Sequence, residues 1–444
     1  MTVPASPQSL NEWLELLESR HPTAIDLGLE RCRAVWERMG SPRPARSIFV
    51  VAGTNGKGST VATICGLLNG LGYRYGSYTT PHLYRYNERV QLQGLPVTDE
   101  ALLHAFQRVE AARMDTSLTY FEFGTLAAFQ LLAEASLDYA VMEIGLGGRL
   151  DAVNLLDADV AVITPIGLDH QEYLGNDIDS IGREKAGVIR PRQPVVCGEP
   201  NPPASVQAIA AEQGARLLRL GVDFRADVAG DAVRYTARGH ELHLPLPALP
   251  GPHQVDNMAT GLAAVLALIP RAVDDADALA RGLRTVRLPG RLQRIAERPA
   301  LWLDVGHNPL GARAVATALR AIRAAEGIEA CRCVIGMLAD KDAAAAVAEL
   351  KPVVSHWYCA GLPGSRGQAG EQLAARIAAA VGAAPLQIFD RVESALKAAL
   401  AEAAPEDGVL VFGSFLTAAE AGNYCRASGR PEPAGPVATS PGRY

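Results

Sequence analysis

The sequence lacks the features that would indicate a nucleic-acid-binding, membrane or secreted protein. Its formal net charge is −6, whereas nucleic-acid-binding domains usually carry a basic excess. No stretch reaches the ~18–20 consecutive apolar residues that a membrane-spanning helix needs. Residues 1–20 are largely polar and do not contain the apolar core of a secretory signal. These absences predict a cytoplasmic protein with no nucleic-acid or membrane partner.

The cysteines also form no pattern that would indicate a disulfide framework. There are seven, an odd number, and they are scattered along the chain. The one close pair, Cys331 and Cys333, lies in an apolar run that predicts a buried strand, where residues two apart share a face. We therefore expect reduced thiols, as in cytoplasmic enzymes.

The chain of 444 residues is too long for one core, so we expect two domains. In its first part, apolar runs alternate with helical patterns, which predicts an α/β fold with a mostly parallel sheet. The expected strands are Ser47–Ala52, Arg74–Thr79, Tyr139–Ile144, Val160–Thr164 and Pro194–Cys197, and the expected helices are Thr60–Leu71, Gly124–Ala135, Ser180–Ile189 and Val255–Leu268. Phe224–Leu246 alternates polar and apolar residues, which favours an antiparallel hairpin or a small sheet.

A second series of strands and helices follows Leu288-Pro289-Gly290, the strongest linker signal in the chain. Its expected strands are Leu301–Val305, Cys331–Gly336, His356–Cys359, Leu386–Phe389 and Val409–Phe412, and its clearest helices are Gly311–Ala325 and Gln372–Val381. We therefore divide the chain into domains at 1–288 and 289–430. Residues 431–444 are rich in Pro, Gly and Ser, which predicts a disordered tail.

A glycine-rich loop, Gly53-Thr54-Asn55-Gly56-Lys57-Gly58-Ser59-Thr60, lies between the first expected strand and the first expected helix. This layout presents backbone N–H groups and a helix N-terminus to phosphate. Lys57 would neutralise nucleotide phosphates, and Ser59 or Thr60 could offer a hydroxyl to Mg²⁺. The loop departs from the general phosphate-loop spacing, because Gly58 separates Lys57 from the hydroxyl. The alternative is a glycine turn with an exposed lysine.

Two further residues follow neighbouring expected strands. Glu143 ends the run at 139–144, and His170 comes shortly after the run at 160–164. Because ligands of open α/β sheets bind at the carboxyl ends of the strands, these side chains could share one metal ion near the loop. The alternatives are a buried, satisfied acid and a surface-loop histidine. Lys185 stands on an expected helix, where a lysine is normally solvated.

Several strings then point to one family. They are GTNGKGST (53–60), TPHLYRYNERV (80–90), FEFGTLAAF (121–129), EIGLGGRLDAVN (143–154), ITPIGLDHQEYLG (163–175), IGREKAGVIR (181–190), GPHQVDNMATGLAA (251–264), PGRLQ (289–293), DVGHNP (304–309) and GSFLT (413–417). In this order they resemble the folylpolyglutamate synthase/dihydrofolate synthase family of the Mur ligase superfamily. The resemblance covers both expected domains.

The resemblance implies an N-terminal P-loop ATPase domain, a C-terminal Rossmann-like domain and an active site between them. It also implies the reaction. ATP phosphorylates a carboxylate of 7,8-dihydropteroate or of a reduced folate, and the amine of L-glutamate attacks the acyl phosphate to form an amide. The family is often monomeric, which implies a monomer here.

The resemblance carries functional roles onto individual positions. The implied ATP-binding residues are Asn55, Gly56, Lys57, Gly58, Ser59, Thr60, Asn257, Arg291 and Asp304. The implied Mg²⁺ ligands are Ser59, Thr80, Glu143, His170 and Lys185, the last as N6-carboxylysine, which would hold a second ion. Lys57, Lys185 and His307 are the implied catalytic residues. Thr80 stands where the family commonly has serine, and His307 has the alternative of an ordinary loop histidine.

The implied pterin- and folate-binding residues are Thr23, Ala24, Ile25, Asp26, Thr119, Phe121, Phe123, Leu150, Asp151 and Ala152. The two phenylalanines could pack on a flat pterin or aminobenzoate ring; the alternative for both is core packing. Tyr84, Arg85, Tyr86 and Arg89 lie beside Thr80 and could contact a substrate carboxylate.

Three other functions compete with a bifunctional enzyme. A monofunctional folylpolyglutamate synthase would share these strings. A Mur-type peptide ligase usually carries a separate N-terminal UDP-binding domain, for which the 52 residues before the loop leave no room. A non-catalytic nucleotide-binding regulator would be expected to lack Lys57, Glu143 or Lys185, and all three are present.

Overall fold

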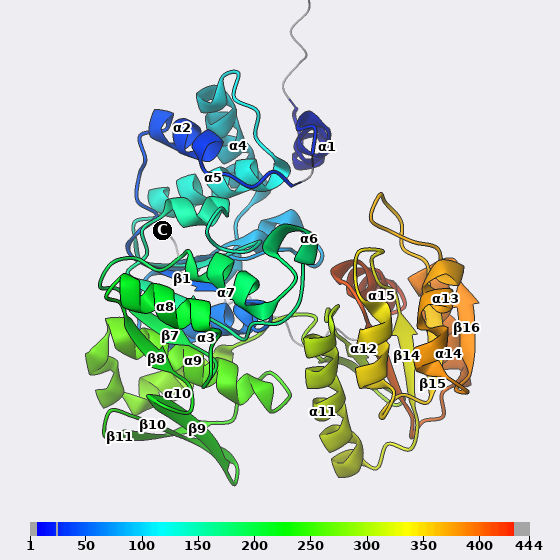
Figure 1. Ribbon diagram of the computed structural model, residues 1–444. Coiled ribbons are helices and arrows are strands. Elements are labelled where there is room, and N and C mark those ends of the chain that lie inside the picture. The colour runs from blue at the N-terminus through cyan, green and yellow to red at the C-terminus, as the bar shows by residue number, and fades with distance from the viewer. Residues whose placement is uncertain (1–6, 24, 430–444) are drawn as a thin grey trace, which may run out of the picture. The chain divides into compact units, whose positions relative to one another are not determined.

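The computed structural model describes residues 7–23 and 25–429. Position 24 and the tail at 431–444 lie outside the described residues. The described chain separates into two compact units (Figure 1). The first lies within Met1–Leu246 and Val255–Val286, and the second within Pro247–Gln254 and Arg287–Tyr444. The chain crosses between the units at 246–247, 254–255 and 286–287, and the last of these crossings lies beside the predicted division near residue 288.

The first unit is built on an eight-stranded sheet in the order β4-β3-β2-β5-β1-β6-β7-β8. Its strands are β1 (Ala45–Ala52), β2 (Tyr75–Tyr78), β3 (Val90–Leu92), β4 (Leu95–Pro96), β5 (Leu137–Glu143), β6 (Val160–Ile163), β7 (Pro194–Cys197) and β8 (Arg216–Arg219). Neighbours from β2 to β8 pair in parallel, and β3 and β4 extend the sheet antiparallel at one end. The predicted mostly parallel sheet is confirmed.

Helices and 3₁₀ turns accompany this sheet. They are α1 (Leu10–Arg20), α2 (Glu30–Arg38), α3 (Lys57–Gly70), η1 (Tyr86–Arg89), α4 (Asp99–Arg113), α5 (Tyr120–Glu134), η2 (Ala152–Leu155), α6 (Gln171–Leu174), α7 (Ile178–Ala186), α8 (Ala204–Glu212), α9 (His253–Leu268), η3 (Pro270–Asp274) and α10 (Ala276–Thr285). No helix in the described part of the chain is long and apolar enough to cross a membrane.

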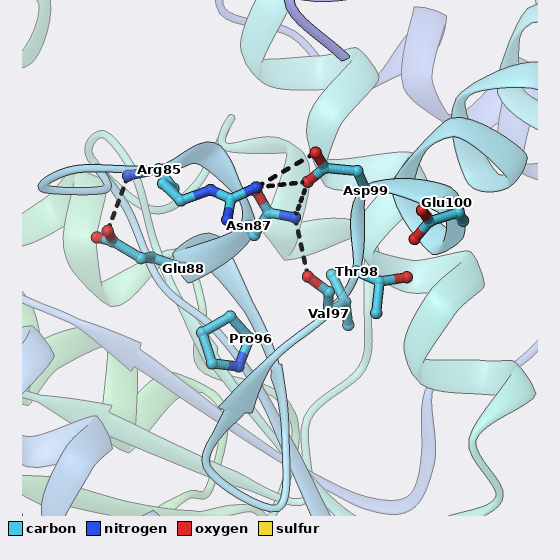
Figure 2. A pocket seen from close by; sticks show the side chains of 8 residues that line it. All are labelled: Arg85, Asn87, Glu88, Pro96, Val97, Thr98, Asp99 and Glu100. Carbon is cyan, nitrogen blue, oxygen red and sulfur yellow. Dashed lines mark hydrogen bonds and ion pairs between the residues drawn. The ribbon is translucent and has the colours of Figure 1, made fainter. Parts of the chain in front are cut away.

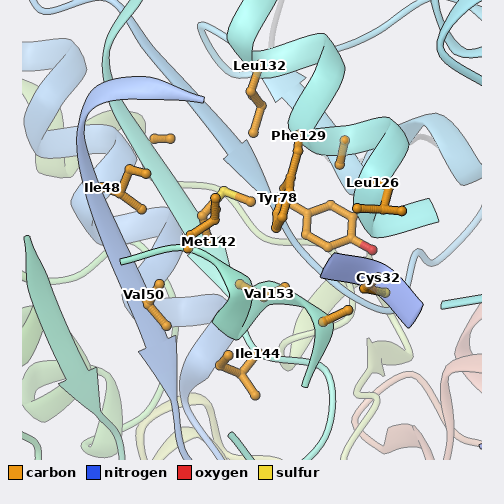
Figure 3. Close-up of a cluster of buried hydrophobic side chains, with 14 of the residues drawn as sticks. Cys32, Ile48, Val50, Tyr78, Leu126, Phe129, Leu132, Met142, Ile144 and Val153 are labelled. Atoms are coloured by element: carbon orange, nitrogen blue, oxygen red, sulfur yellow. The ribbon is translucent and has the colours of Figure 1, made fainter. Parts of the chain in front are cut away.

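The central strand β1 is apolar throughout because both of its faces are covered. Ile48 and Val50 belong to a core with α5, where Phe129 and Leu126 pack (Figure 3). The alternate residues of β1 face a second core, formed with α3 and α9. This two-sided burial fixes the strand, and with it the loop that follows.

An antiparallel hairpin or a small sheet was predicted for Phe224–Leu246. The structure has the small sheet, which is antiparallel, has three strands and belongs to the first unit. It has the order β11-β10-β9, with β9 (Phe224–Ala229), β10 (Ala232–Ala237) and β11 (His240–Pro245). Val233 and Tyr235 of β10 and Leu242 and Leu244 of β11 are buried, while the residue between the members of each pair is exposed. The polar–apolar alternation thus reflects one buried face.

The second unit contains a six-stranded sheet in the order β12-β13-β17-β14-β15-β16, parallel except for β12. Its elements are β12 (Gln293–Glu297), β13 (Ala300–Leu303), α11 (Pro309–Glu326), β14 (Cys331–Ile335), α12 (Ala343–Leu350), β15 (His356–Ala360), α13 (Gly370–Val381), β16 (Leu386–Phe389), α14 (Val392–Glu402), β17 (Gly408–Phe412) and α15 (Phe415–Ala427). Cys331 and Cys333 are buried on β14 as free thiols, as predicted.

Helices α3 and α10 approach each other at two glycines. A Cβ on Gly282 would lie 2.2 Å from the carbonyl oxygen of Gly66, and a Cβ on Gly66 would lie 2.8 Å from that of Gly282. Backbone stands in both positions, so a side chain could be admitted only if the helices separated. Because α3 begins at the phosphate loop, its contact with α10 helps to hold the loop in place.

We expect Gly282→Ala to lower the free energy of unfolding by about 1–3 kcal/mol, because the added methyl group overpacks the α3–α10 contact. Chemical denaturation followed by circular dichroism would measure the loss. Arg281→Ala, on the exposed side of α10, is the matched control and should leave stability nearly unchanged. An unchanged midpoint for Gly282→Ala would mean that the two helices do not approach this closely.

Candidate active site

The glycine-rich loop connects β1 to α3, and two of its glycines have backbone conformations that other residues rarely adopt. Gly53 has φ +144° and Gly56 has φ +87°. A Cβ on Gly53 would lie 1.9 Å from the hydroxyl oxygen of Thr164, and one on Gly56 would lie 2.4 Å from Oδ1 of Asn257. Both positions therefore require glycine. The same contacts bring Asn257, on α9, to the loop.

Hydrogen bonds to the β6 loop hold the glycine-rich loop in place. The amides of Thr54 and Asn55 donate to the carbonyl of Pro165, at 3.0 and 3.3 Å. The Thr54 hydroxyl donates to the carbonyl of Gly167 at 3.1 Å and accepts from its amide at 3.0 Å. These bonds to the loop after β6 hold the glycine-rich loop in place without a ligand, as a preorganised anion site requires.

Two lysine side chains converge on one carbonyl of this loop. Nζ of Lys57 donates to the carbonyl oxygens of Gly53 and Thr54, at 3.2 and 3.1 Å. Nζ of Lys185 donates to the same Gly53 oxygen at 2.8 Å. Lys185 is only 4% exposed, so this lysine is not the solvated helix residue that its local sequence indicates. The structure brings together the two lysines implied to be catalytic.

Close packing of α7 on the loop after β5 accounts for the burial of Lys185. A Cβ on Gly148 would lie 2.9 Å from the carbonyl oxygen of Lys185 and 3.0 Å from its Cα. The Arg149 amide donates to the Glu184 carbonyl at 2.8 Å. Burial and, after it, the charge of Lys57 lower the pKa of the Lys185 amine to about 7, although the charges of Asp169 and Asp151 act in the opposite direction.

Thr80 and Glu143 also come together, from the ends of neighbouring strands. The Thr80 amide donates to Oε2 of Glu143 at 3.3 Å, and Glu143 is 5% exposed. Glu143 pairs in register with Val51, two residues before Gly53, so these residues share the carboxyl edge of the sheet. A carboxylate beside a hydroxyl-bearing residue provides the oxygen ligands that Mg²⁺ prefers.

His170 lies at the end of the loop that follows β6, in the left-handed conformation at φ +52°. Its amide donates to Oδ1 of Asp169 at 2.9 Å, and its Nε2 lies 3.9 Å from the same oxygen. Asp169 was not predicted as a site residue. In the sequence, only its position directly before His170 could have indicated it. In the structure, its charge acts to raise the pKa of Lys185.

Asp151 and Phe121 meet at Gly145, in the loop after β5. A Cβ on Gly145 would lie 2.6 Å from the Phe121 ring and 3.3 Å from Oδ2 of Asp151. Asp151 accepts hydrogen bonds from the amides of Leu146 and Val153, at 2.8 and 2.9 Å. Burial nevertheless raises the pKa of Asp151 to about 7. Phe121 is partly exposed, so its ring could contact a ligand.

Phe123, two residues further along α5, has a different environment. It is fully buried and packs against Trp13 and Phe106, with ring centroids 5.9 and 5.4 Å away. Core packing, the alternative interpretation, describes this side chain. We therefore keep only Phe121 as a candidate for the flat substrate ring.

The start of α5 is tied to the segment between α1 and α2. Thr119 caps the helix: its hydroxyl accepts from the Glu122 amide, and Glu122 accepts from the Thr119 amide. Arg31 then bridges the buried Glu122 and the half-buried Asp26, at 2.8 Å each. The structure thus joins Asp26 and Thr119, far apart in sequence, through Arg31.

Four other predicted substrate residues can be placed only by their exposure. Thr23 is exposed, Ile25 and Leu150 are partly buried, and Ala152 is buried at the start of η2. Ala24 lies outside the described residues. Ser59 and Thr60, in the first turn of α3, are buried, and the hydroxyl oxygen of Thr60 has no hydrogen-bond partner among the described residues.

The candidates in the second unit form their own cluster. The amides of Leu292 and Gly306 donate to the two carboxylate oxygens of Asp304, at 2.8 and 2.7 Å. Burial raises the pKa of Asp304, while the charges of Arg291 and His307 act to lower it. Nδ1 of His307 lies 3.0 Å from the Val305 carbonyl oxygen, within hydrogen-bond distance.

The environment of Lys185 predicts a pH dependence of stability. An unfolded lysine has a pKa of about 10.4, whereas the folded amine has a pKa of about 7. The unfolded chain therefore binds more protons across this interval, so Lys185 makes stability rise as pH rises from about 7 to about 10.

In CO₂-free buffer, this contribution should reach about 2 kcal/mol between pH about 7 and about 9. The free energy of unfolding from denaturant titrations at the two pH values would measure it, and Lys185→Met should lose this part of the gain. Equal pH dependence in both proteins would mean that the amine is not perturbed by burial.

Comparison with known proteins agrees with this arrangement. The Mur ligase middle domain matches residues 51–265, and the Mur ligase glutamate ligase domain matches residues 290–415. The dihydrofolate synthase/folylpolyglutamate synthase of Escherichia coli K12 is 45% identical over 423 residues, which cover 94% of this chain and 97% of that protein.

Solved structures give the same result. FolC of E. coli in complex with DHPP and ADP is similar with a TM-score of 0.89 and 43% identity, covering 96% of this chain and all of that one. The bifunctional enzyme of Yersinia pestis complexed with AMPPNP and a Mn ion has a TM-score of 0.87 and 42% identity, with the same coverage. The chain belongs to the dihydrofolate synthase/folylpolyglutamate synthase family of ATP-dependent Mur ligases.

Proposed function

We propose that the chain uses ATP to join the amino group of L-glutamate to the carboxylate of 7,8-dihydropteroate and to the γ-carboxylate of reduced folates. The observation that carries the proposal is the convergence of Lys57 and Lys185 on the carbonyl of Gly53. This carbonyl belongs to a loop whose positions 53 and 56 require glycine. Family membership supplies the reaction. A cytoplasmic location and a monomeric state stay predictions.

The loop fits a nucleotide phosphate by its chemistry. The start of α3 presents backbone N–H groups and the positive end of the helix dipole. Gly56 leaves the backbone open, and Asn257 lies against it. We infer that Asn55 to Thr60 bind the ATP phosphates. Lys57 would neutralise charge on the transferred group, since a carboxylate and a γ-phosphate repel each other.

Mg²⁺ would supply further charge neutralisation. Thr80 and Glu143 fit such an ion because a buried carboxylate stands beside a hydroxyl-bearing residue at the same sheet edge as the loop. We propose Ser59 and His170 as additional ligands. Arg291 and Asp304 are proposed for ATP, and His307 for glutamate or the reaction intermediate.

The reaction then has two steps. An oxygen of the substrate carboxylate attacks the γ-phosphorus of ATP and ADP leaves, giving an acyl phosphate. The amine of glutamate attacks the carbonyl carbon, and the tetrahedral intermediate releases phosphate and a proton. The contribution of this chain is mainly to position the reactants and to stabilise charge.

We further propose that Lys185 reacts with CO₂ to form N6-carboxylysine. The neutral Nζ would attack the carbon of CO₂ and lose a proton, which converts a cation into an oxygen ligand for a second Mg²⁺. Burial of the side chain beside Lys57 supports this, because a pKa near 7 leaves much of the amine unprotonated. The Asp151 carboxyl and the ring of Phe121 are the best candidates for contact with the pterin.

The direct test is glutamate incorporation by the purified protein with ATP and Mg²⁺. Dihydropteroate should give dihydrofolate, and tetrahydrofolate should be glutamylated. Lys57→Ala should reduce turnover at least about 100-fold, the loss typical of removing a group that stabilises transition-state charge. Circular dichroism should show the fold unchanged. If only tetrahydrofolate is used, the protein is a monofunctional folylpolyglutamate synthase.

The carbamate has its own test. Lys185→Ala should lower kcat at least about 100-fold, since the proposed metal ligand is lost. Added acetate or formate should partly restore activity by supplying carboxylate oxygens in the vacated space. Lys351→Ala, in which the exposed Lys351 of the second unit is replaced, is the control. Near-normal activity of Lys185→Ala would contradict the carbamate.

A further inference from the structure

Arg89 is a buried arginine for which no carboxylate partner is found in residues 7–23 and 25–429. It is 7% exposed. Its Nε donates to Nδ1 of His82 at 3.0 Å, and its guanidinium carbon lies 4.8 and 5.3 Å from the ring centroids of Tyr86 and Tyr120. A buried charge without a counter-ion is costly. Such a residue is commonly retained for a ligand.

The neighbouring arginine provides the contrast. Arg85 is exposed and binds both carboxylate oxygens of Asp99, at 2.9 and 3.2 Å. Figure 2 shows Arg85, Asn87 and Asp99 directed toward one another at a surface pocket. The charge of Arg85 is therefore already balanced. Of the two arginines in the loop after Thr80, Arg85 is paired with a carboxylate of the described residues and Arg89 is not.

The surroundings hold the Arg89 guanidinium in a fixed place. The Thr79 amide donates to the Arg89 carbonyl at 2.8 Å, so Arg89 is anchored next to Thr80 on the proposed metal side. Tyr120 is the first residue of α5, directly before Phe121 on the proposed pterin side. Tyr86 is also fixed, because a Cβ on Gly124 would lie 2.2 Å from its hydroxyl. Arg89 thus stands between the two sides.

The two substrates differ in how many anionic groups they bring there. Dihydropteroate has a single carboxylate, and that carboxylate reacts. The terminal glutamate of a reduced folate has two, so when the γ-carboxylate reacts the α-carboxylate remains. The planar guanidinium group of an arginine matches a carboxylate in a bidentate pair.

We propose that Arg89 binds the α-carboxylate of the terminal glutamate of folate substrates, and so serves glutamate addition to folates but not to dihydropteroate. His82 and the rings of Tyr86 and Tyr120 position its guanidinium group. This inference rests on the proposed function and names the residue that distinguishes its two substrates.

The test compares both reactions in wild type, Arg89→Met and Arg89→Lys. In Arg89→Met we expect KM for tetrahydrofolate to rise about 10- to 100-fold, the loss typical of a charged hydrogen-bonded pair. KM for dihydropteroate should change less than about threefold, within the scatter of an indirect effect. Arg89→Lys keeps the positive charge but cannot form the bidentate pair, so its KM for tetrahydrofolate should lie between those of wild type and Arg89→Met. Arg108→Met is the control, because Arg108 pairs with Glu134 on the surface.

A second arm uses tetrahydrofolate in which the α-carboxylate is replaced by a carboxamide. In the wild type, KM for this analogue should exceed KM for tetrahydrofolate by about the factor that Arg89→Met causes with tetrahydrofolate. In Arg89→Met, KM for the analogue should be little higher than KM for tetrahydrofolate. A wild-type KM unchanged by the carboxamide would overturn the proposal, even if the Met variant did not fold.

Other outcomes are equally decisive. Equal losses on both substrates with a raised KM for glutamate would assign Arg89 to the incoming glutamate. If Arg89→Met impairs both reactions equally and also lowers the unfolding midpoint, Arg89 has a structural role and the proposal is wrong. A wild type that forms no dihydrofolate would contradict the bifunctional assignment, and the carboxamide arm would still test Arg89 on the folate reaction.

Discussion

One backbone carbonyl, that of Gly53, organises the centre of this enzyme. It accepts hydrogen bonds from two lysines that lie far apart in sequence, Lys57 and Lys185. For both to reach it, β1 must be buried on both faces, α7 must press on the loop after β5, and the glycine-rich loop must be bonded to the loop after β6. Burial and, after it, the nearby charge of Lys57 explain why Lys185 has a lowered pKa.

The fold could be predicted where the sequence pattern reflects burial directly. The apolar runs at β1, β5 and β6 are buried parallel strands, so their existence was clear and only their ends shifted. The strands β3, β4, β8 and β12 were not predicted. They lie at or near the ends of their sheets and contain at most one buried residue each, so no apolar period marks them in the sequence.

The candidate site shows the same division. Glycine and lysine spacing marks the phosphate loop in the sequence, because the chemistry is local. The burial of Lys185 is not local: it depends on Gly53 and Gly148, 132 and 37 positions earlier in the chain. Phe121 and Phe123 could not be separated for a similar reason. Residues two apart on a helix face different ways, and only the packing of α1 and α4 decides which ring is enclosed.

The free thiols described earlier have a consequence for observing this molecule. Burial raises the pKa of Cys32, Cys197, Cys331 and Cys359 alike, so in the native state they react slowly with thiol reagents. Cys32 and Cys197 belong to the first unit, and Cys331 and Cys359 to the second. The rate at which each becomes labelled under native conditions is therefore the opening rate or opening equilibrium of its own unit. Because these cysteines are native to the chain, they can report how ATP or a folate stabilises each unit separately without the introduction of new cysteines.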